Sequence, residues 1–253
     1  MYPVLAAHSL IDVHALKFYV TRPHDCPYLP GRLAVDVVAD PQAAIARERI
    51  SELFGLGFRR SGMFVYRPEC PGCQACVAAR IPVAMFRASR AQRRCAARNA
   101  DLVIERAVPA YTDEFFELYC RYLGVRHAGG GMDDPTPESF REFLCTPGVE
   151  SEFLLFRDAG RLVCVAVTDV LDNGLSANYT FFDPDATARS LGTFAILTQI
   201  AHARRSGYDY VYLGYWIAEA EKMRYKSRFR PLELYRDGRW WVWPAGVAEP
   251  PVT

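Results

Sequence analysis

Three consecutive apolar segments in the second half of the chain constrain its fold more than any other feature. They cover residues 152–157, 162–170 and 175–182. Each segment is rich in the β-branched and aromatic residues that are typical of strands. The turn sequences Asp158-Ala159-Gly160 and Asn173-Gly174 join them, and Asn-Gly is the strongest short hairpin signal in the sequence. We therefore expect an antiparallel meander of three strands.

Helical patterns lie on both sides of this meander. The expected elements are helices from about Thr112 to Leu123, from Thr136 and from about Ser190 to Arg205, a strand at Tyr210–Leu213, a short helix near Glu219–Tyr225, and a final hairpin of Leu232–Tyr235 with Trp240–Trp243. A helical pair, a meander, a long helix and a strand follow one another in this order in GNAT-type acyltransferases, which is an analogy of fold only. The fold class is therefore expected to be α/β (α+β), with a mixed, mostly antiparallel sheet.

The first half contains shorter elements. Strands are expected at Leu33–Val38, Phe58–Tyr66 and Leu102–Ala107. Asp40-Pro41 is a favourable helix start, and that helix is expected to reach Phe54. Ser89 and Gln92 have the spacing of a capping box for a second helix, which ends near Asn99. These elements predict a small mixed, cysteine-containing domain before the GNAT-like one.

We place the boundary between these two domains after residue 108, so that they cover 1–108 and 109–253. The triple glycine at 129–131 indicates a mobile loop or a close approach of the backbone to a ligand.

Cys70, Cys73 and Cys76 stand at every third position of a Pro/Gly-containing loop between two expected strands. Cysteine repeats this regular hold a metal ion or a cluster far more often than they fill a core. The chain has eight cysteines, and its start lacks a basic segment before a long apolar stretch. Together these features predict a reducing, cytoplasmic location and no disulfide framework.

The net charge of +1 excludes a globally basic nucleic-acid binder. We therefore do not expect DNA as a partner. No apolar run approaches the ~18–20 residues that span a bilayer, so we do not expect a membrane as a partner either. Two acid-free runs are nonetheless basic: Arg87, Arg90, Arg93, Arg94 and Arg98, and Lys222, Arg224, Lys226, Arg228 and Arg230. Such focused patches attract a phosphate backbone, and the alternative is two solvated faces. Arg87, Arg90, Arg94 and Arg98 fall on one helical face, which suits an RNA backbone.

The start of the long helix after the meander has a partial anion-binding motif. A GNAT binds the pyrophosphate of its acyl carrier there, through an R/Q-x-x-G-x-G/A turn. Arg189, Ser190 and Gly192 fit this turn, whereas Phe194 replaces the last small residue. The substitution argues against coenzyme A as the carrier and leaves an acyl-transfer cradle plausible. We therefore assign Arg189, Ser190 and Gly192 to tRNA binding.

Several long motifs resemble those of the bacterial leucyl-tRNA–protein transferases (aspartate/glutamate leucyltransferases), relatives of the eukaryotic arginyl-tRNA–protein transferases. They are Cys26-Pro27-Tyr28-Leu29, GFRRSG at 57–62, PECPGCQACVAARIPV at 68–83, SRAQRRCAARN at 89–99, AVTDVLDNGLSANYTFFDPD at 166–185, RSLGTFAIL at 189–197 and VYLGYWIAEAEKMRYKSRF at 211–229. The motifs span most of the chain in the order of the family. The resemblance implies transfer of leucine from leucyl-tRNA to proteins with N-terminal Asp or Glu, which marks them for degradation and requires no cofactor.

An acidic acceptor residue requires cations, and arginine binds a carboxylate through two parallel hydrogen bonds. Within the motifs, the resemblance implies an acceptor site made from Arg59, Arg60, Ser61, Arg80, Lys222, Tyr225, Lys226 and Arg228. Contact with the tRNA backbone remains an alternative for both halves of this set. A leucyl pocket should be apolar, and the motifs offer Phe181, Phe182, Leu213, Tyr215 and Trp216 as its wall.

The reaction needs no powerful base. An α-amine with a pKa of ~7.7–8.0 is partly neutral near pH 7, and oriented reactants gain ~7–11 kcal/mol. The sequence has no Ser-His-Asp or Cys-His signature. Asp169, Tyr179 and Asp183 lie along the family-like meander and are the candidates for proton removal, with water as an alternative.

Cys26 joins Cys70, Cys73 and Cys76 as a candidate ligand set for zinc or an iron–sulfur cluster. The eukaryotic relatives are linked with iron–sulfur binding, but Arg80 stands where a ferredoxin would have its fourth cysteine. A metal-free site lined by thiols is the alternative. Three other functions also remain open: a coenzyme A-dependent N-acetyltransferase, a non-enzymatic tRNA- or zinc-binding module, and a transferase with an arginyl donor.

Overall fold

The computed structural model of the protein describes residues 16–126, 134–248 and 250, so the triple glycine at 129–131 lies outside the described residues. The strands are β1 (Phe18–Val20), β2 (His24–Asp25), β3 (Leu33–Ala34), β4 (Asp36–Ala39), β5 (Arg59–Ser61), β6 (Phe64–Pro68), β7 (Val77–Pro82), β8 (Val103–Ala107), β9 (Ser151–Asp158), β10 (Arg161–Val170), β11 (Gly174–Phe182), β12 (Tyr210–Trp216), β13 (Leu232–Arg236) and β14 (Arg239–Trp243). The helices are α1 (Arg47–Gly55), α2 (Arg90–Arg98), α3 (Asp113–Arg126), α4 (Pro137–Leu144), α5 (Leu191–Arg205) and α6 (Glu221–Arg224), with 3-10 turns η2 (Thr187–Arg189) and η3 (Tyr225–Arg228).

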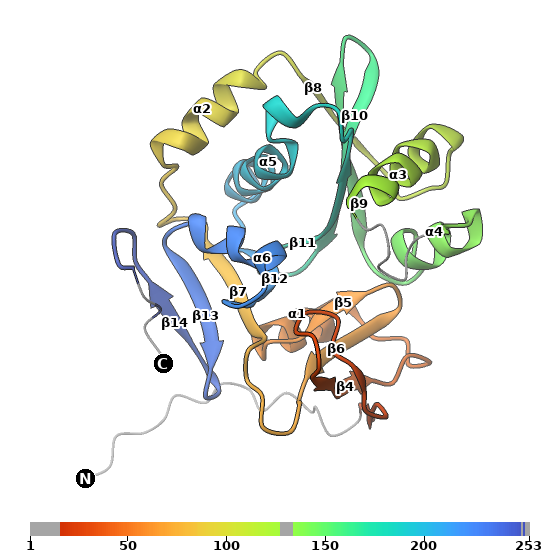
Figure 1. Ribbon diagram of the computed structural model, residues 1–253, viewed down its shortest axis with the longest axis vertical. Helices are drawn as coiled ribbons and strands as arrows, with labels where there is room; N and C mark the ends of the chain where they lie inside the picture. Colours follow the sequence, from red (N-terminus) through yellow and green to blue (C-terminus); the bar gives the residue numbers. More distant parts are fainter. Residues whose placement is uncertain (1–15, 127–133, 249, 251–253) are drawn as a thin grey trace.

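Two sheets organise these elements (Figure 1). The large sheet has the strand order β14-β13-β7-β12-β11-β10-β9-β8, and the small sheet has the order β1-β4-β6-β5. The β2–β3 ladder stands apart from both. In the large sheet, β11 and β12 run parallel, whereas the other described pairs are antiparallel. The expected fold class, a mixed and mostly antiparallel sheet with helices, is confirmed.

The predicted meander is present as β9, β10 and β11. Ala159 and Gly160 have φ of 46° and 87°, and Asp237 and Gly238 have φ of 51° and 75°. Two-residue hairpins with this backbone match the twist of the strands that they connect. The β9–β10 turn and the final β13–β14 hairpin therefore form where the turn residues predict them.

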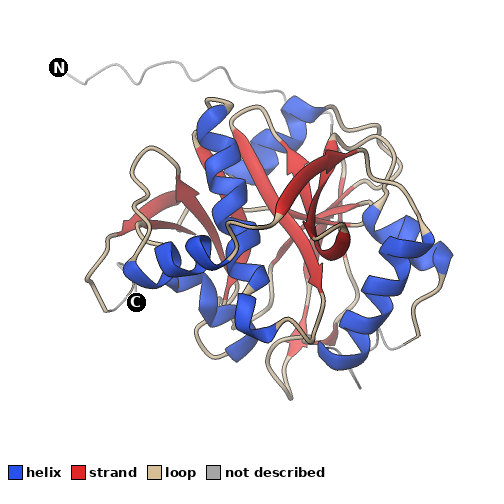
Figure 2. Ribbon diagram, turned by 90° about the horizontal axis from the view of Figure 1, so that it is seen from above, coloured by secondary structure: helices blue, strands red, loops and turns tan. Residues whose placement is uncertain are grey.

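Helices cover both faces of the large sheet (Figure 2). On one face, α5 packs on the central strands, with Ile196, Ile200 and Val211 in the core between them. On the other face, α3 and α4 bury Phe140 against Phe153 and the rest of an aromatic cluster. No helix in the described part of the chain is long and apolar enough to cross a membrane.

The small sheet is joined to the large one through α1. Leu53 packs with Val65 of the small sheet, whereas Phe54 packs edge-on against Tyr212 of β12, with ring centroids 5.6 Å apart. This helix begins at Arg47 and not at Asp40, as the sequence led us to expect. The Oδ1 atom of Asp40 accepts a hydrogen bond from the Gln42 N–H at 3.0 Å, so Asp40 closes a local turn in place of capping a helix.

The capping box of α2 forms as predicted. The Ser89 Oγ accepts from the Gln92 N–H, and the Gln92 side chain accepts from the Ser89 N–H. The expected domain boundary at residue 108, however, does not coincide with a break between sheets. Both β7 and β8 precede it and belong to the large sheet, where β7 pairs with β12 and β13.

A buried ion pair docks the small sheet onto the large one. Arg60 of β5 binds Asp169 of β10 through two hydrogen bonds of 2.5 and 3.1 Å, and both side chains are 1% exposed. The second terminal nitrogen of Arg60 donates to the Gly62 carbonyl at 2.6 Å, and Asn178 donates to Asp169 at 3.0 Å. Arg60 and Asp169 are therefore occupied by each other, and the geometry supports neither an acceptor-binding nor a proton-removing role for them.

We expect the substitution Arg60→Met to destabilise the protein by about 3–5 kcal/mol, because it leaves the Asp169 carboxylate buried without its partner. Urea unfolding of the purified proteins measures this change. Arg49→Ala is the matched control, since it removes a half-exposed i,i+3 pair with Glu52 and should cost less than about 1 kcal/mol. Equal losses in the two variants would contradict the docking role of Arg60.

Candidate functional site

The candidate site lies where β11 and β12 separate. These strands pair in parallel over three residues only, Gly174–Ser176 with Tyr210–Tyr212. Beyond this point, β11 continues to Phe182 and β12 to Trp216 without pairing with each other. The register of β12 against β7 also shifts between Tyr212 and Gly214. Separated strands leave backbone groups in the middle of the sheet without partners from each other.

Arg59 of β5 enters this gap. Its Nη2 atom lies 3.5 Å from the carbonyl oxygen of Asn178 in β11, and its guanidinium lies 6.0 Å from the ring centroid of Tyr215 in β12. Gly214 has a φ of +71°, and a Cβ atom there would lie 3.1 Å from Nη1 of Arg59. A side chain at Gly214 would therefore be strained and would crowd the guanidinium.

Tyrosines surround Arg59, and no described carboxylate forms an ion pair with it. Burial acts to lower the pKa of Arg59, but the hydroxyls of Tyr66, Tyr28 and Tyr215 act in the opposite direction and leave the pKa above its ordinary value. Tyr215 is itself fixed, because its hydroxyl donates toward the carbonyls of Gly57 and Tyr66 at 3.2 and 3.0 Å. The guanidinium is thus held as a cation without an anionic partner.

Lys226 of η3 is a second cation of this kind. It is 3% exposed, and its Nζ atom donates to the Tyr215 carbonyl and lies 3.3 Å from the Met223 sulfur. Burial, reinforced by the charge of Arg59, holds the pKa of Lys226 well below its ordinary value. Within residues 16–126 and 134–248, Lys226 pairs with no carboxylate. Arg59 and Lys226 therefore form a cation pair without a counter-ion.

Other cations of the predicted acceptor site are paired or exposed. Arg80 binds Glu233 at 2.6 Å and lies between the rings of Tyr210 and Trp240, with its guanidinium 3.6 and 4.1 Å from their centroids. It therefore ties β7 to β13. Ser61 lines a cavity beside the small sheet, whereas Lys222, Tyr225 and Arg228 are exposed.

Tyr225 approaches the cation pair from the α6–η3 segment. Tyr225 remains 40% exposed, but desolvation around its hydroxyl, partly offset by the charge of Arg59, raises the pKa of Tyr225 to about 12. Its hydroxyl therefore stays protonated at neutral pH and is able to donate a hydrogen bond beside Arg59. Of the eight residues predicted for the acceptor site, Arg59, Tyr225 and Lys226 are the three that the structure brings together.

The two remaining candidates for proton removal are poorly suited to it. Asp183 is 2% exposed and pairs with Arg121 at 2.8 Å and Arg161 at 2.5 Å. Burial acts to raise the pKa of Asp183, but these arginines outweigh it and hold the pKa below its ordinary value. Tyr179 packs its ring against Phe143, and burial raises its pKa. The Tyr179 hydroxyl has no hydrogen-bond partner among the described residues.

The two basic runs meet on one surface. The Gln92 side chain of α2 donates to the Arg228 carbonyl of η3 at 3.1 Å, which places the two segments side by side. Arg90, Arg94 and Arg228 are exposed, and none of them forms an ion pair within the described chain. We call Arg87, Arg90, Arg93, Arg94, Arg98, Arg224 and Arg228 the basic face.

Some residues predicted for tRNA binding are already engaged. Arg98 donates to the Ala188 carbonyl, and Arg87 donates to the carbonyls of Ala84 and Phe86. Both arginines remain exposed. Arg189 pairs with Asp101 at 2.8 Å and Asp158 at 2.9 Å, so its charge is neutralised at the start of α5. Ser190 adopts a left-handed conformation and makes no side-chain cap, and Gly192 lies against Phe182.

Cysteines lie beside the site, where Cys26, Cys70 and Cys76 line a neighbouring cavity. Cys70 exchanges hydrogen bonds with the Val35 backbone, and Cys73 accepts one from Arg32 at 3.3 Å. Burial, together with the charges of the other three thiols, raises the pKa of Cys76 to about 12. Metal ligands must be thiolates, and no group of three or more His, Cys, Asp or Glu side chains in the described chain is placed to hold a metal ion. A metal at Cys26, Cys70, Cys73 and Cys76 therefore stays a prediction.

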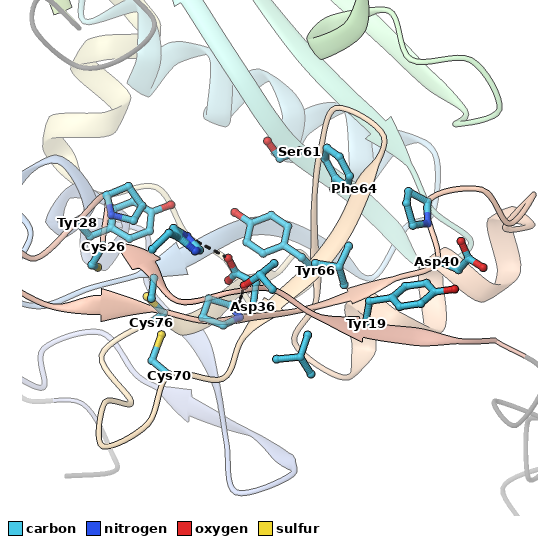
Figure 3. A pocket seen from close by; sticks show the side chains of 18 of the residues that line it. Tyr19, Cys26, Tyr28, Asp36, Asp40, Ser61, Phe64, Tyr66, Cys70 and Cys76 are labelled. Carbon is cyan, nitrogen blue, oxygen red and sulfur yellow. Dashed lines mark hydrogen bonds and ion pairs between the residues drawn. The ribbon is translucent and has the colours of Figure 1, made fainter.

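A cavity of about 640 Å³ opens beside the cysteines on the small sheet (Figure 3). Tyr28 and Tyr66, which both act on Arg59, also line this cavity. The cavity and the cation pair are therefore neighbours. Sequence reasoning found neither these tyrosines nor Gly214 as parts of a site. An isolated glycine in the strand Tyr210–Trp216 is a signal of a bulge or a close approach that was available to it.

The proposed leucyl wall is largely inaccessible. Phe181, Leu213, Tyr215 and Trp216 are all buried within the described structure. Phe182 is the exception, because it is half-buried, and its ring centroid lies 5.0 Å from that of Tyr122. Phe182 packs on the face that α5 covers, beside Gly192, whereas its neighbour Phe181 is buried in the aromatic cluster under α3 and α4.

Comparison with known proteins identifies relatives along nearly the whole chain. Residues 24–94 match the family described as arginine-tRNA-protein transferase, N terminus, and residues 114–236 match arginine-tRNA-protein transferase, C terminus. The aspartate/glutamate leucyltransferase of Pseudomonas fluorescens (strain Pf0-1) is 48% identical over 233 residues, which cover 92% of this chain and 99% of that protein. The aspartate/glutamate leucyltransferase of Pseudomonas savastanoi pv. phaseolicola (strain 1448A / Race 6) is 49% identical over 231 residues, which cover 91% and 98%. Among solved structures, L-PGS from Bacillus licheniformis aligns with a TM-score of 0.46 at 14% identity, over 66% of this chain and 62% of that chain.

We expect the buried Lys226 to make the stability of the protein depend on pH. The folded state holds the pKa of Lys226 below the ordinary value of 10.5, so between these two values the unfolded chain binds more protons. The free energy of unfolding should therefore rise with pH through this window, by up to ~1.4 kcal/mol per pH unit. Urea unfolding of the wild type and of Lys226→Met across this range measures the difference.

The variant Lys226→Met should lack this contribution, so its curve should be flatter than that of the wild type. Lys222→Met is the matched control, because Lys222 is exposed in the neighbouring turn of the same segment. It should keep the slope of the wild type. Parallel curves for the wild type and Lys226→Met would contradict a buried lysine with a lowered pKa.

Proposed function

Because the chain belongs to the arginine-tRNA-protein transferase family and is an aminoacyltransferase, we propose that it transfers leucine from leucyl-tRNA to proteins that begin with Asp or Glu. The α-amine of the acceptor attacks the leucyl ester on the terminal ribose. An amide bond forms, the ester bond breaks, and the ribose hydroxyl leaves with the proton. Leucyl-tRNA as the donor implies a reaction in the cytoplasm.

The observation that carries this proposal is the cation pair in the gap between β11 and β12. A buried charge without a partner costs several kcal/mol, so a fold that encloses an arginine and a lysine without a carboxylate gains nothing from this arrangement in the free protein. Arg59 and Lys226 have no carboxylate of the described chain within ion-pair reach, and like charges oppose each other. The side-chain carboxylate of an N-terminal Asp or Glu would supply the missing anion, and the guanidinium fork of Arg59 matches its geometry.

Lys226 also offers a route for the proton. The α-ammonium of the acceptor must become an amine before it attacks, and the lowered pKa of Lys226 makes its amine available at a lower pH than that of an ordinary lysine. A proton that moves from the acceptor to Lys226 leaves a neutral α-amine and an ammonium beside the bound carboxylate. No carboxylate base is needed in this scheme, in keeping with the pairing of Asp169 and Asp183 by arginines.

The basic face supports a tRNA as the carrier. It joins α2 to the α6–η3 segment, and this segment also carries Lys226. Exposed arginines without acidic partners bind an RNA backbone by neutralising its phosphates. A tRNA on this face is therefore bound in part by the same segment that carries Lys226.

The alternatives receive less support from the geometry. Coenzyme A would require an anion site at the start of α5, where Arg189 is neutralised by two carboxylates. Phe194, which departs from the GNAT turn, packs against Phe156 in the core with ring centroids 5.6 Å apart. An arginyl donor would require a buried acid, and both Asp169 and Asp183 are occupied by arginines. Leucine is therefore the favoured donor.

We expect Arg59→Met to lower kcat/KM for peptides that begin with Asp or Glu by about 30-fold or more, since losing one partner of a buried charge pair costs ~2–5 kcal/mol. The assay supplies labelled leucyl-tRNA or arginyl-tRNA with peptides that begin with Asp, Glu, Arg or Ala. Arg67→Met serves as the control, because Arg67 lies on the neighbouring strand and pairs with Glu69. Transfer to an Asp peptide at the wild-type rate by Arg59→Met would rule out the acceptor site.

Neutralising Arg90, Arg94 and Arg228 together by substitution with Gln should weaken binding of leucyl-tRNA. Each phosphate contact contributes ~0.7–0.9 to the slope of log K against log salt, so the slope should become shallower by about 2–3. Filter binding between low and moderate salt measures both quantities. A second triple variant, with Gln at Arg22, Arg141 and Arg239, removes the same charge from exposed positions outside the basic face. Equal effects of the two variants would argue against a specific face.

A further inference from the structure

The transfer reaction proposed above does not use the cavity on the small sheet. Its volume of about 640 Å³ is that of a site for a small ligand or a short peptide segment. Its walls are mostly aromatic and aliphatic, and Figure 3 shows Tyr19, Tyr28, Phe64 and Tyr66 around it. Two carboxylates, those of Asp36 and Asp40, line it, whereas no lysine or arginine among the described residues does.

Asp36 lines the cavity and lies near the centre of the side chains labelled in Figure 3. Its side chain is 18% exposed, and its ion-pair partner in the described chain is His24, whose Nε2 atom lies 3.6 Å away. Burial raises the pKa of Asp36, and the charge of His24 offsets this only in part. A partly buried carboxylate in an apolar cavity is stabilised by a cation that enters the cavity.

The cavity also continues toward the cation pair. Tyr28 and Tyr66 line it, and their hydroxyls act on Arg59. The ring of Tyr66 is in edge contact with that of Tyr215, with centroids 6.1 Å apart. Cys76 lines the same end of the cavity and acts on Lys226. A peptide whose first side chain reaches Arg59 thus has its next residues beside the mouth of this cavity.

We propose that the cavity receives the residues that follow the acidic first residue of the acceptor protein, and that Asp36 selects a basic side chain among them. This inference rests on the proposed function. The aromatic walls accept the apolar stem of a lysine or arginine side chain, while Asp36 meets its charged end. An acidic residue at the same place is disfavoured, because it brings like charge toward Asp36 and Asp40.

The electrostatic pattern of the protein supports this acceptor. Arg59 and Lys226, which have no carboxylate partner in the described chain, lie next to a cavity whose described lining has two carboxylates and no Lys or Arg side chain. The complementary polypeptide begins with an acid and continues with a base. Repulsion contributes to selection as much as attraction does, so the difference between a basic and an acidic second segment should exceed the gain from either alone.

Transfer of labelled leucine to peptides that begin with Asp tests this proposal. In the peptides, Lys, Ala or Glu occupies position 2, 3 or 4 in turn. At one of these positions we expect kcat/KM to be about tenfold higher with Lys than with Glu at low salt, a ratio that corresponds to ~1.4 kcal/mol. The variant Asp36→Asn should reduce this ratio to about 2 or less. A ratio within one protein is insensitive to the fraction of that protein that is folded.

Asp25→Asn is the matched control, since Asp25 is exposed on the neighbouring strand β2 and does not line the cavity. It should keep the wild-type ratio. Transfer to Asp peptides with equal rates for Lys and Glu at every position would overturn this inference and leave the proposed function intact. A preference for Lys that survives in Asp36→Asn would also overturn it. No transfer to any peptide would instead remove the proposed function itself.

Discussion

The ion pair between Arg60 and Asp169 fixes the geometry on which the site depends. Arg59 and Arg60 are adjacent in β5, so their side chains point to opposite faces of the strand. Once Arg60 is bound by Asp169 of the large sheet, Arg59 can point only toward the gap between β11 and β12, where Gly214 leaves room for it. One buried pair therefore docks the small sheet and aims the neighbouring cation, and a shift of one residue would exchange the two roles.

Pairing separates structural cations from functional ones in this protein. Arg80 and Arg189 each have carboxylate partners, and each ties together elements that lie far apart in the sequence. Arg59 and Lys226 are also enclosed, but tyrosine rings, carbonyl oxygens and a sulfur take the place of carboxylates around them. Enclosure without an anion is unfavourable in the free protein, so it indicates binding of an anion that the chain does not itself supply.

The sequence predicted the parts of the fold that short-range chemistry determines. The capping box at Ser89, the hairpin at Asp237-Gly238 and the meander all depend on residues within a few positions of each other. The sequence did not show that Arg60 is bound in an ion pair and Arg59 is not, because the partner of Arg60 is Asp169, 109 positions later in the chain. The helix expected at Asp40 failed for a local reason, since the same carboxylate that caps a helix also closes a turn. The boundary predicted after residue 108 does not separate the two sheets, because the chain passes from β6 of the small sheet to β7 of the large one well before it.

Selection and activation of the acceptor follow from one binding event in this arrangement. Before binding, the charge of Arg59 helps to lower the pKa of Lys226. When the acidic side chain of the acceptor reaches Arg59, it partly cancels that charge, and the affinity of Lys226 for a proton rises. The nearest proton donor that arrives with the acceptor is its own α-ammonium, which must lose a proton to react. An acceptor with a neutral first side chain brings no anion, so Lys226 stays a poor proton acceptor and the α-amine stays charged. The same two cations thus make the acidic residue a condition for chemistry and not merely for affinity.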